Sequence, residues 1–365
     1  MGSVWGNAIK LSIFGESHGG GIGCVLDGFP AGVPYDEAFI LAEMDRRAPG
    51  KNRQSTARRE KDLPKVLSGV FEGKTSGAPI SCVIENTDTR SKDYRNLIEQ
   101  PRPGHADYTG RVRYQGCNDY RGGGHFSGRL TAPLVFAGAM CKLFLRSKGI
   151  EVGSHISAIG QIMDTPFDDV HVPTELLAKL RTQAYPVINP RAEEAMLVQI
   201  DQAREAQDSV GGIIECAVTG MPVGIGSPML SPVEGRLSSI LFSVPAVKGV
   251  EFGAGFSIAA MRGSEANDCM YLDGDTVKTE TNNNGGILGG ITNGMPIIVR
   301  AAIKPTPSIS REQRTLHLID QQVEPLVIKG RHDPCIVTRA APVIEAAVAV
   351  AVTDLYLEAY GYARS

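Results

Sequence analysis

The chain of 365 residues lacks the features that mark several common classes of protein. Its net charge is -3 at pH 7, so it has no overall positive field of the kind that binds nucleic acid. Its seven cysteines are scattered and odd in number, and no C-x-x-C pair occurs. That pattern argues against a disulfide framework and against a structural zinc site. We therefore expect a cytoplasmic protein that has no nucleic-acid partner.

A segment long enough to cross a membrane is also missing. The most apolar runs, Leu130–Cys141 and Ala346–Val352, are shorter than the ~20 residues that span a bilayer. The first residues lead to the polar loop Gly15–Gly23 without the charged and apolar regions of a secretory signal. We expect both apolar runs to be buried core helices, and no membrane partner.

Motifs for metal and nucleotide binding are absent as well. No H-E-x-x-H or comparable ligand spacing occurs, so we expect no metal site. The segment Ser68–Thr75 resembles a phosphate-binding P-loop, but Ser68 stands where that motif requires glycine. No dinucleotide fingerprint is present.

Hydrophobic periodicity predicts a mixture of helices and strands. Helices are expected at Tyr35–Arg47, at Leu130–Lys148, around Leu237–Phe242, and over Pro173–Gln207 with a break at Tyr185–Pro190. Strands are expected at Val4–Phe14, Cys24–Leu26, Val66–Glu72, Pro79–Glu85, Val210–Thr219 and Ile297–Ile303. The arginine-rich stretch Lys51–Lys61 is typical of a solvated loop. The glycine-rich stretch Thr281–Gly294 is expected to be packed backbone rather than disorder, because apolar residues lie between its glycine pairs.

Two stretches, Leu67–Ile80 and Leu288–Ile297, share a weak similarity in their glycines, prolines and apolar residues. Their spacings differ by four residues, so coincidence and duplication both explain it. A duplication would imply two related β-rich halves. Because no proline- or serine-rich linker separates such halves, residues 1–365 are expected to form one domain.

The stretch Arg102–Arg129 is the densest in groups that bind anions and move protons. It contains two of the seven histidines, five arginines and the triplet Gly122–Gly124. Arginine binds phosphate or carboxylate through paired donors, and glycine lets backbone N–H groups approach a planar or anionic ligand. A flexible turn is the alternative interpretation of the triplet.

Three separate loops combine histidine with groups that assist proton transfer. They contain Ser17 with His18, His105 with Asp107, and the segment Arg331–Asp333. Histidine exchanges protons near neutral pH, although a single histidine is more often structural. Further arginines imply an anionic ligand, phosphate or carboxylate, and they include Arg46, Arg47, Arg53, Arg121, Arg129 and Arg331. Together these residues predict an enzyme that binds anionic small molecules.

At these loops the chain resembles the chorismate synthase family. The matching blocks are GESHGGGIG from Gly15, DRRAPGKNR from Asp45, RPGHADYTG from Arg102, YRGGGHFSGR from Tyr120, AVKGVEFG from Ala246, GGILGGITNG from Gly285, KPTPSI from Lys304 and GRHDPC from Gly330. They run in family order across nearly the whole chain.

The resemblance implies a phosphate-eliminating carbon–oxygen lyase of the shikimate pathway. Such an enzyme converts 5-enolpyruvylshikimate 3-phosphate to chorismate by an anti-1,4-elimination that needs reduced FMN without net redox change. The implied fold is an α+β, β-α-β sandwich with long core helices between antiparallel sheets, assembled as a homotetramer. NADPH and a separate flavin reductase are alternative sources of reduced flavin.

The resemblance also implies roles for individual residues. His18 would protonate the departing phosphate, and His105 would protonate the flavin near its N1–C2 edge. Asp333 would help the flavin N5 take the substrate proton, with Ser17 and Ser127 close by. The flavin-binding positions would be His125, Phe126, Ser127, Ala246, Gly289, Lys304, Pro305, Thr306, Pro307, Ser308 and Arg331. Substrate or NADPH would contact Arg47, Arg53 and Arg129.

The chain departs from the family's common GGGRSSARET block, because His125 and Phe126 stand where arginine and serine are frequent and Leu130 replaces glutamate. These changes remove or alter a cation and a hydroxyl near the flavin, so an altered flavin affinity is expected. Two other functions remain open: an FMN-dependent oxidoreductase acting on an anionic small molecule, and a flavin- or anion-binding module without catalysis. Stoichiometric NADPH consumption would identify the oxidoreductase.

Overall fold

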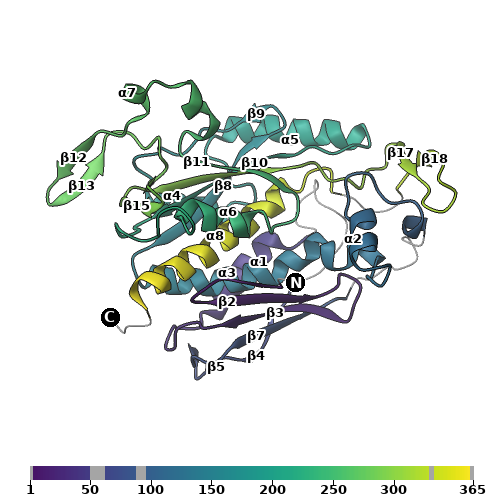
Figure 1. Ribbon diagram of the computed structural model, residues 1–365, viewed down its shortest axis with the longest axis horizontal. Helices are drawn as coiled ribbons and strands as arrows, with labels where there is room; N and C mark the ends of the chain where they lie inside the picture. The colour runs from purple at the N-terminus through teal and green to yellow at the C-terminus, as the bar shows by residue number, and fades with distance from the viewer. Residues whose placement is uncertain (1–2, 50–61, 88–95, 329–332, 362–365) are drawn as a thin grey trace.

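The computed structural model describes residues 3–49, 62–87, 96–328 and 333–361, and it places long helices between two antiparallel sheets (Figure 1). Each of these sheets has five strands. The predicted α+β sandwich with core helices between antiparallel sheets is therefore confirmed.

The first sheet is built from the N-terminal part of the chain. Its strands lie in the order β1 (Val4–Trp5), β2 (Lys10–Gly15), β3 (Gly21–Asp27), β7 (Ile80–Glu85) and β4 (Lys65–Ser68). Apolar side chains alternate along β7, where Ile80, Cys82 and Ile84 are buried. Because side chains of a strand point alternately to its two faces, one face of this sheet packs on the helices.

The single strand predicted for Val4–Phe14 is divided into β1 and β2. Gly6 has a φ of 107°, which turns the chain between the two strands. The carboxylate of Asp354 accepts hydrogen bonds from the backbone N–H groups of Asn7 at 3.0 Å, Ala8 at 2.8 Å and Ile9 at 2.9 Å. A partner almost 350 residues away in the chain stabilises this turn, so local periodicity could not predict it.

The second sheet comes from the C-terminal part. Its order is β11 (Val247–Phe252), β16 (Ile297–Ile303), β10 (Gly212–Thr219), β8 (Glu151–Ile159) and β9 (Ile162–Met163). Strand β8 is buried over nearly its whole length because helices cover both of its faces. The hydroxyl of Ser154 donates to the carbonyl of Ala341, whereas Gly153 lies against Leu177 on the opposite side.

The core helices are α1 (Glu37–Arg47), α3 (Thr131–Arg146), α6 (Val233–Leu241) and α8 (Val337–Tyr360). Helices α3 and α8 pack so closely that a Cβ added at Gly138 would overlap Ala346. The segment Gly128–Arg146, which includes α3, and helix α8 are long and apolar enough to cross a membrane, contrary to the expectation from the two shorter apolar runs. However, 89% of each segment is buried inside the protein. The two apolar runs are therefore core helices, as the sequence predicted.

The remaining elements lie between these strands and helices. They are β5 (Val70–Phe71), β6 (Lys74–Thr75), α2 (Asp107–Arg113), η2 (Arg121–Phe126), η3 (Gly128–Leu130), α4 (Thr174–Thr182), α5 (Pro190–Glu205), η4 (Gly255–Ala260), α7 (Gly263–Ala266), β12 (Met270–Asp273), β13 (Thr276–Thr279), β14 (Ile287–Leu288), β15 (Ile291–Thr292), β17 (Gln313–Leu316) and β18 (Val323–Leu326). The hairpin β14–β15, with Ile287 buried, shows that the glycine-rich stretch is packed backbone. The loop predicted at Lys51–Lys61 lies outside the described residues.

Four of the five strands in each sheet have the same spatial order relative to the chain. In the first, β2, β3, β7 and β4 are neighbours, with α1 following β3 and α3 following β7 later in the chain. In the second, β8, β10, β16 and β11 are neighbours, with α6 after β10 and α8 after β16. Strands β7 and β16 begin at Ile80 and Ile297, the last residues of the two similar sequence stretches. The expectation of one domain, with two related halves as the outcome of a duplication, stays a prediction.

Candidate active site

The loop between β2 and β3 places Ser17 and His18 at one end of the first sheet. Ser17 is completely buried and His18 nearly so. The hydroxyl of Ser17 donates to the carbonyl of Gly122 at 3.1 Å, and its oxygen lies 2.8 Å from Nδ1 of His18. Which of these two atoms donates depends on the tautomer of the imidazole.

The glycine triplet lies between two histidines. Gly122, Gly123 and Gly124 have φ values of 59°, 85° and 53°, in the left-handed region that glycine occupies without strain. A Cβ at Gly122 would overlap the ring of His18, and one at Gly123 would lie 3.2 Å from Cε1 of His105. The triplet therefore packs between two imidazoles, with Gly123 and Gly124 buried.

His105 lies just before helix α2, within a cluster of charged groups. Its Nδ1 is 2.6 Å from Oδ1 of Asp107 and 3.0 Å from Nη2 of Arg102. Arg102 also donates to both carboxylate oxygens of Asp107 at 2.7 Å and to the hydroxyl of Ser308 at 3.0 Å. Burial by itself raises the pKa of Asp107, but hydrogen bonds from Arg102 and His105 outweigh it and hold this pKa well below its usual range.

The segment Lys304–Ser308 runs beside the loop that precedes His105. The ammonium group of Lys304 donates to the carbonyl of Gly104, and its backbone N–H donates to the carbonyl of Ala246 at 2.9 Å. Burial and the nearby Lys248 lower the pKa of Lys304. The hydroxyl oxygen of Thr306 is buried and has no hydrogen-bond partner among the described residues. A buried polar group without a protein partner has a free hydrogen-bonding position for a water or a ligand.

Two predicted substrate-binding arginines converge on a buried carboxylate. Asp62 accepts hydrogen bonds from Arg47 of α1 and from Arg129 of η3. Arg129 also contacts Oδ1 of Asn86 at 3.1 Å, and the amide of Asn86 donates to the carbonyl of Glu16 at 2.9 Å. Burial by itself raises the pKa of Asp62, but the two guanidinium groups outweigh it and lower this pKa. Asn86 thus links the arginine cluster to the loop of His18.

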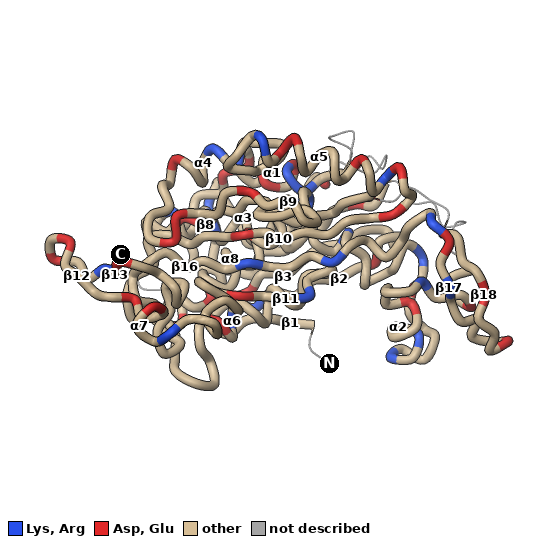
Figure 2. The backbone as a smooth tube through the Cα atoms, turned by 90° about the horizontal axis from the view of Figure 1, so that it is seen from above, with Lys and Arg blue, Asp and Glu red and all other residues tan. Residues whose placement is uncertain are grey.

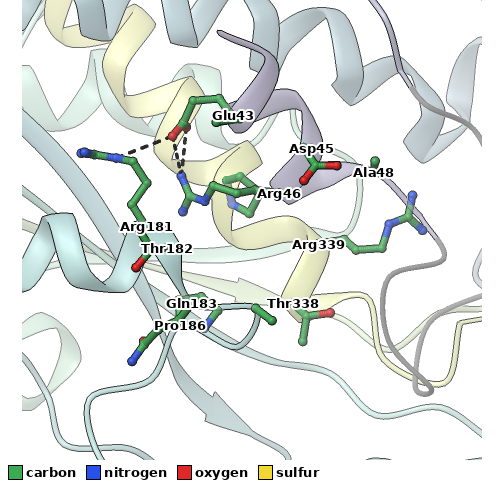
Figure 3. Close-up of a pocket in the computed structure, with 13 residues that line it drawn as sticks. Glu43, Asp45, Arg46, Ala48, Arg181, Thr182, Gln183, Pro186, Thr338 and Arg339 are labelled. Atoms are coloured by element: carbon green, nitrogen blue, oxygen red, sulfur yellow. Dashed lines mark hydrogen bonds and ion pairs between the residues drawn. The ribbon is translucent and has the colours of Figure 1, made fainter. Parts of the chain in front are cut away.

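Asp333 lies close to the start of α8 and pairs with a residue of the same helix. Nη1 of Arg339 donates to Oδ2 of Asp333 at 2.7 Å, and Nε of Arg339 donates to the carbonyl of Arg47 at 3.3 Å. Arg339 also lines a pocket of about 380 Å³ together with Arg46 and Arg181 (Figure 3). This pocket adjoins the arginine cluster through Arg339 and does not contain the histidines.

Of the other predicted site residues, some lie close to the histidine loops and one lies far from them. Nδ1 of His125 donates to the carbonyl of Gly15 at 2.9 Å, and Ser127 caps η3 through a hydrogen bond from the N–H of Arg129. The ring of Phe126 packs on α2, with its centroid 6.1 Å from that of Tyr114. Gly289 lies in the turn of β14–β15, which Figure 1 shows well away from α2. Arg53 and Arg331 lie outside the described residues.

The structure thus brings predicted residues together in two groups, one around the histidines and one in which Asp333 and Arg47 share Arg339 as a partner. Ser17, His18, His105, Ser127 and the segment 304–308 are connected through Gly122–Gly124, Arg102 and Lys304. Gly289 belongs to neither group.

Sequence reasoning missed Asp62, Asn86 and Arg339. Asp62 follows an arginine-rich polar run, where a carboxylate is unremarkable. A cation in the first turn of a helix opposes the helix dipole, so Arg339 carried a signal that it needs an anionic partner.

Comparisons with known proteins show which family the chain resembles. The chain matches the family model described as chorismate synthase over residues 9–357. It is 46% identical to the chorismate synthase of Thermococcus kodakarensis over 349 residues, which cover 96% of each chain. It is 47% identical to that of Methanocella arvoryzae, covering 97% of this chain and 94% of the relative. A crystal structure of chorismate synthase superposes with a TM-score of 0.76 at 30% identity, covering 98% of this chain and 94% of the other.

Proposed function

The chain belongs to the chorismate synthase family, and we propose that the loops around His18, His105 and Asp333 form its active site. The enzyme is a lyase that converts 5-enolpyruvylshikimate 3-phosphate to chorismate and phosphate, a step of aromatic amino acid biosynthesis. Family membership also implies dependence on a reduced flavin. The observation that supports this site best is the glycine triplet, which brings His18 and His105 to its two sides.

The flavin would be FMN, held by the segment Lys304–Ser308. The buried, unpartnered hydroxyl of Thr306 fits a polar group of the cofactor, and the ammonium of Lys304 would attract its phosphate. Ala246, which is hydrogen-bonded to Lys304, would line the same site. When bound, reduced FMN would supply an electron-rich ring that stabilises positive charge in the allylic system as phosphate leaves.

His18 would donate the proton that accompanies the departing phosphate. Because Nδ1 is engaged by Ser17, the proton for transfer would be held at Nε2. A phosphate that leaves protonated is a better leaving group than one that leaves with its full charge. Gly122 packs against the imidazole and the serine, and it would keep both in place.

His105 and Asp333 would hold protons on the flavin side of the site. The Nε2 edge of His105 lies against Gly123, and the carboxylate of Asp333 is oriented by Arg339. Asp333 would act as the eventual acceptor of the substrate proton. Ser127 follows the glycine triplet, and its backbone N–H donates to the carbonyl of Gly124.

The anionic groups of the substrate would bind near Arg47 and Arg129. Asp62 holds the two guanidinium groups together. Arg53 and Arg331 are proposed contacts for the substrate or NADPH and for FMN, respectively. His125 and Phe126 are proposed to line the flavin, and Gly289 is a proposed flavin contact that lies apart from them in this chain.

Anaerobic phosphate release tests the proposed function. We expect the protein to release phosphate from 5-enolpyruvylshikimate 3-phosphate only when reduced FMN is present, because the flavin must stabilise the transition state. Release at an equal rate without flavin would refute the proposal. Consumption of one NADPH for each phosphate released would favour the FMN-dependent oxidoreductase. Comparing NADPH alone with NADPH plus an added flavin reductase decides how the flavin is reduced.

The assembly is proposed to be a cytoplasmic homotetramer. Large apolar side chains are exposed on the second half, with Met229 87%, Leu230 97% and Phe256 86% accessible, which supports burial against other copies. Hairpin β12–β13 projects from the body at the end opposite β17–β18 (Figure 2) and exposes Met270 and Leu272. Sedimentation velocity would measure the assembly; a monomer at micromolar concentration would contradict the tetramer.

All seven cysteines are free, which supports a reducing compartment such as the cytoplasm.

A further inference from the structure

Arg339 connects two parts of the proposed active site, the carboxylate of Asp333 and the end of helix α1. Its Nη1 donates to Oδ2 of Asp333 at 2.7 Å, and its Nε donates to the carbonyl of Arg47 at 3.3 Å. The side chains of Arg339 and Asp333 are 22% and 11% exposed, so most of this ion pair is shielded from water. Because the donors of a planar guanidinium have fixed directions, the two contacts together define its orientation. One oxygen of Asp333 is therefore held in a defined place relative to α1.

Helices α1 and α8 are joined by a buried ion cluster. Arg46 of α1 contacts Oε2 of Glu345 of α8 at 2.8 Å. Lys142 of α3 contacts Oε2 of Glu43 of α1 at 2.6 Å and also pairs with Glu345. Removing one partner from a buried ion cluster leaves an uncompensated charge, so the two helices keep a fixed relation to each other. The arginine side chain that contacts Asp333 thus extends from a rigid base.

The short segment between Asp333 and Arg339 gives two further observations. The carbonyl of Pro334 accepts a hydrogen bond from the backbone N–H of Val210 at 2.9 Å, which attaches this segment to the residues that precede β10. Arg339 itself lies in the first turn of α8, where a cation opposes the helix dipole. The stability of the helix therefore does not explain this arginine, whereas its contact with Asp333 does.

We propose that Arg339 is a positioning residue, which holds the carboxylate of Asp333 in the orientation in which it accepts the substrate proton. This catalytic consequence rests on the proposed function, whereas the placement of the carboxylate does not. Arg47 has separate support, because its guanidinium donates to Asp62 and to the hydroxyl of Thr131 at 3.1 Å. Loss of the Arg339 side chain should therefore displace the proton acceptor and leave the substrate-binding arginine in place.

Arg339→Ala tests this role in the full-length enzyme. We expect kcat for anaerobic phosphate release with reduced FMN to fall by about 10- to 100-fold, because a proton acceptor displaced by about 1 Å reacts much more slowly. KM for the substrate should change by less than about threefold, because Arg47 keeps its other partners. A kcat within about threefold of the native value, or a loss that appears only in KM, would overturn the proposal.

Rescue by free guanidinium distinguishes positioning from a general loss of stability. Arg339 lines the pocket of about 380 Å³, so truncation of its side chain leaves space for a small planar cation beside Asp333 (Figure 3). Millimolar guanidinium chloride is far below the concentrations that unfold proteins. It should raise kcat of Arg339→Ala at least about fivefold, whereas sodium chloride at equal concentration should not. Equal effects of the two salts would overturn the role of the guanidinium.

The matched control is Arg181→Ala. Arg181 lines the same pocket, but it pairs with Glu43 and Glu151 instead of Asp333. This variant should keep kcat within about twofold of the native value and should not respond to guanidinium. A fall in kcat equal to that of Arg339→Ala would show that loss of charge from the pocket is responsible, and it would overturn the proposal.

Arg339→Lys keeps the positive charge but lacks the planar pair of donors, so it tests the same role if Arg339→Ala does not fold. We expect kcat to fall by about 5- to 20-fold, and a native kcat would overturn the proposal. In a crystal structure of either unliganded variant, the carboxylate of Asp333 should move by more than about 1 Å, and an unmoved carboxylate would also overturn it. If the native enzyme releases no phosphate at all, the proposed function fails, while the crystal structure still decides whether Arg339 positions Asp333.

Discussion

A buried histidine in the second sheet provides a sharp test of the electrostatics. His155 of β8 is 0% exposed, with Nδ1 2.9 Å from Oδ2 of Asp164 and Nε2 2.8 Å from Oε2 of Glu215. Because both ring nitrogens face carboxylates, the ring carries two hydrogens and a positive charge. Burial by itself lowers the pKa of His155, but the hydrogen bonds to Asp164 and Glu215 outweigh it and raise this pKa.

Replacing His155 by leucine should lower the free energy of unfolding by about 3–5 kcal/mol, because it leaves two buried carboxylates without their shared cation. Each hydrogen bond to a charged group contributes about 1.5–3 kcal/mol. The loss is not larger because both carboxylates keep other partners. Glu215 keeps Arg300 at 3.0 Å and the backbone N–H of Phe167 at 2.8 Å, and Asp164 keeps two backbone N–H groups.

The difference in the free energy of unfolding between the native protein and His155→Leu should depend on pH. The pKa of His155 is higher in the folded than in the unfolded protein. The contribution of His155 to the free energy of unfolding is therefore complete below the unfolded pKa of about 6.5, and it is lost as pH rises through the folded pKa. The pKa values of Asp164 and Glu215 are lowered, because hydrogen bonds outweigh the effect of burial, so their contributions are lost as pH falls. The difference should therefore be greatest between about pH 4.5 and 6.5.

Urea unfolding of His155→Leu, compared with native protein across pH 4.5–9 at fixed protein concentration, checks this prediction. The control is His171→Leu, because His171 is exposed and its replacement should change the free energy of unfolding by less than about 0.5 kcal/mol. A loss below about 1 kcal/mol for His155→Leu, or a difference that grows at alkaline pH, would refute a buried imidazolium.

Three further predictions concern the active site and the core. Gly122→Ala should reduce kcat at least about 100-fold, because its Cβ would displace the ring of His18. The control Gly116→Ala, which also has a positive φ but lies in open space, should retain activity. Equal losses of activity in both variants would show that backbone strain alone is responsible. His18→Ala should slow anaerobic phosphate release by about 10²–10⁴-fold, and a near-normal rate would make the histidine structural. Gly138→Ala should lower the free energy of unfolding, measured with urea, by about 1–3 kcal/mol, because its Cβ would overlap Ala346. A gain in stability from helix propensity would contradict the close packing.

Much of the architecture was predictable because its signals are local. The alternation in β7 and the apolar runs of α3 and α8 follow directly from side-chain periodicity. Strand β1 was not separated from β2 in the prediction, since the turn between them is stabilised by Asp354, a residue of the last helix. Periodicity contains no information about a partner so distant in the chain.

In the candidate site, too, some features were predictable from the sequence and others depended on contacts between distant segments. The sequence by itself determined which residue types are present, and the motifs around His18, His105 and Asp333 indicated the family and the reaction. Only the tertiary structure decided that Gly122–Gly124 separates two imidazoles and that Asp62 joins Arg47 to Arg129. The physical reason is that a hydrogen bond or a steric contact depends on distances of a few ångströms, and these distances are set by the packing of segments that are far apart in the chain.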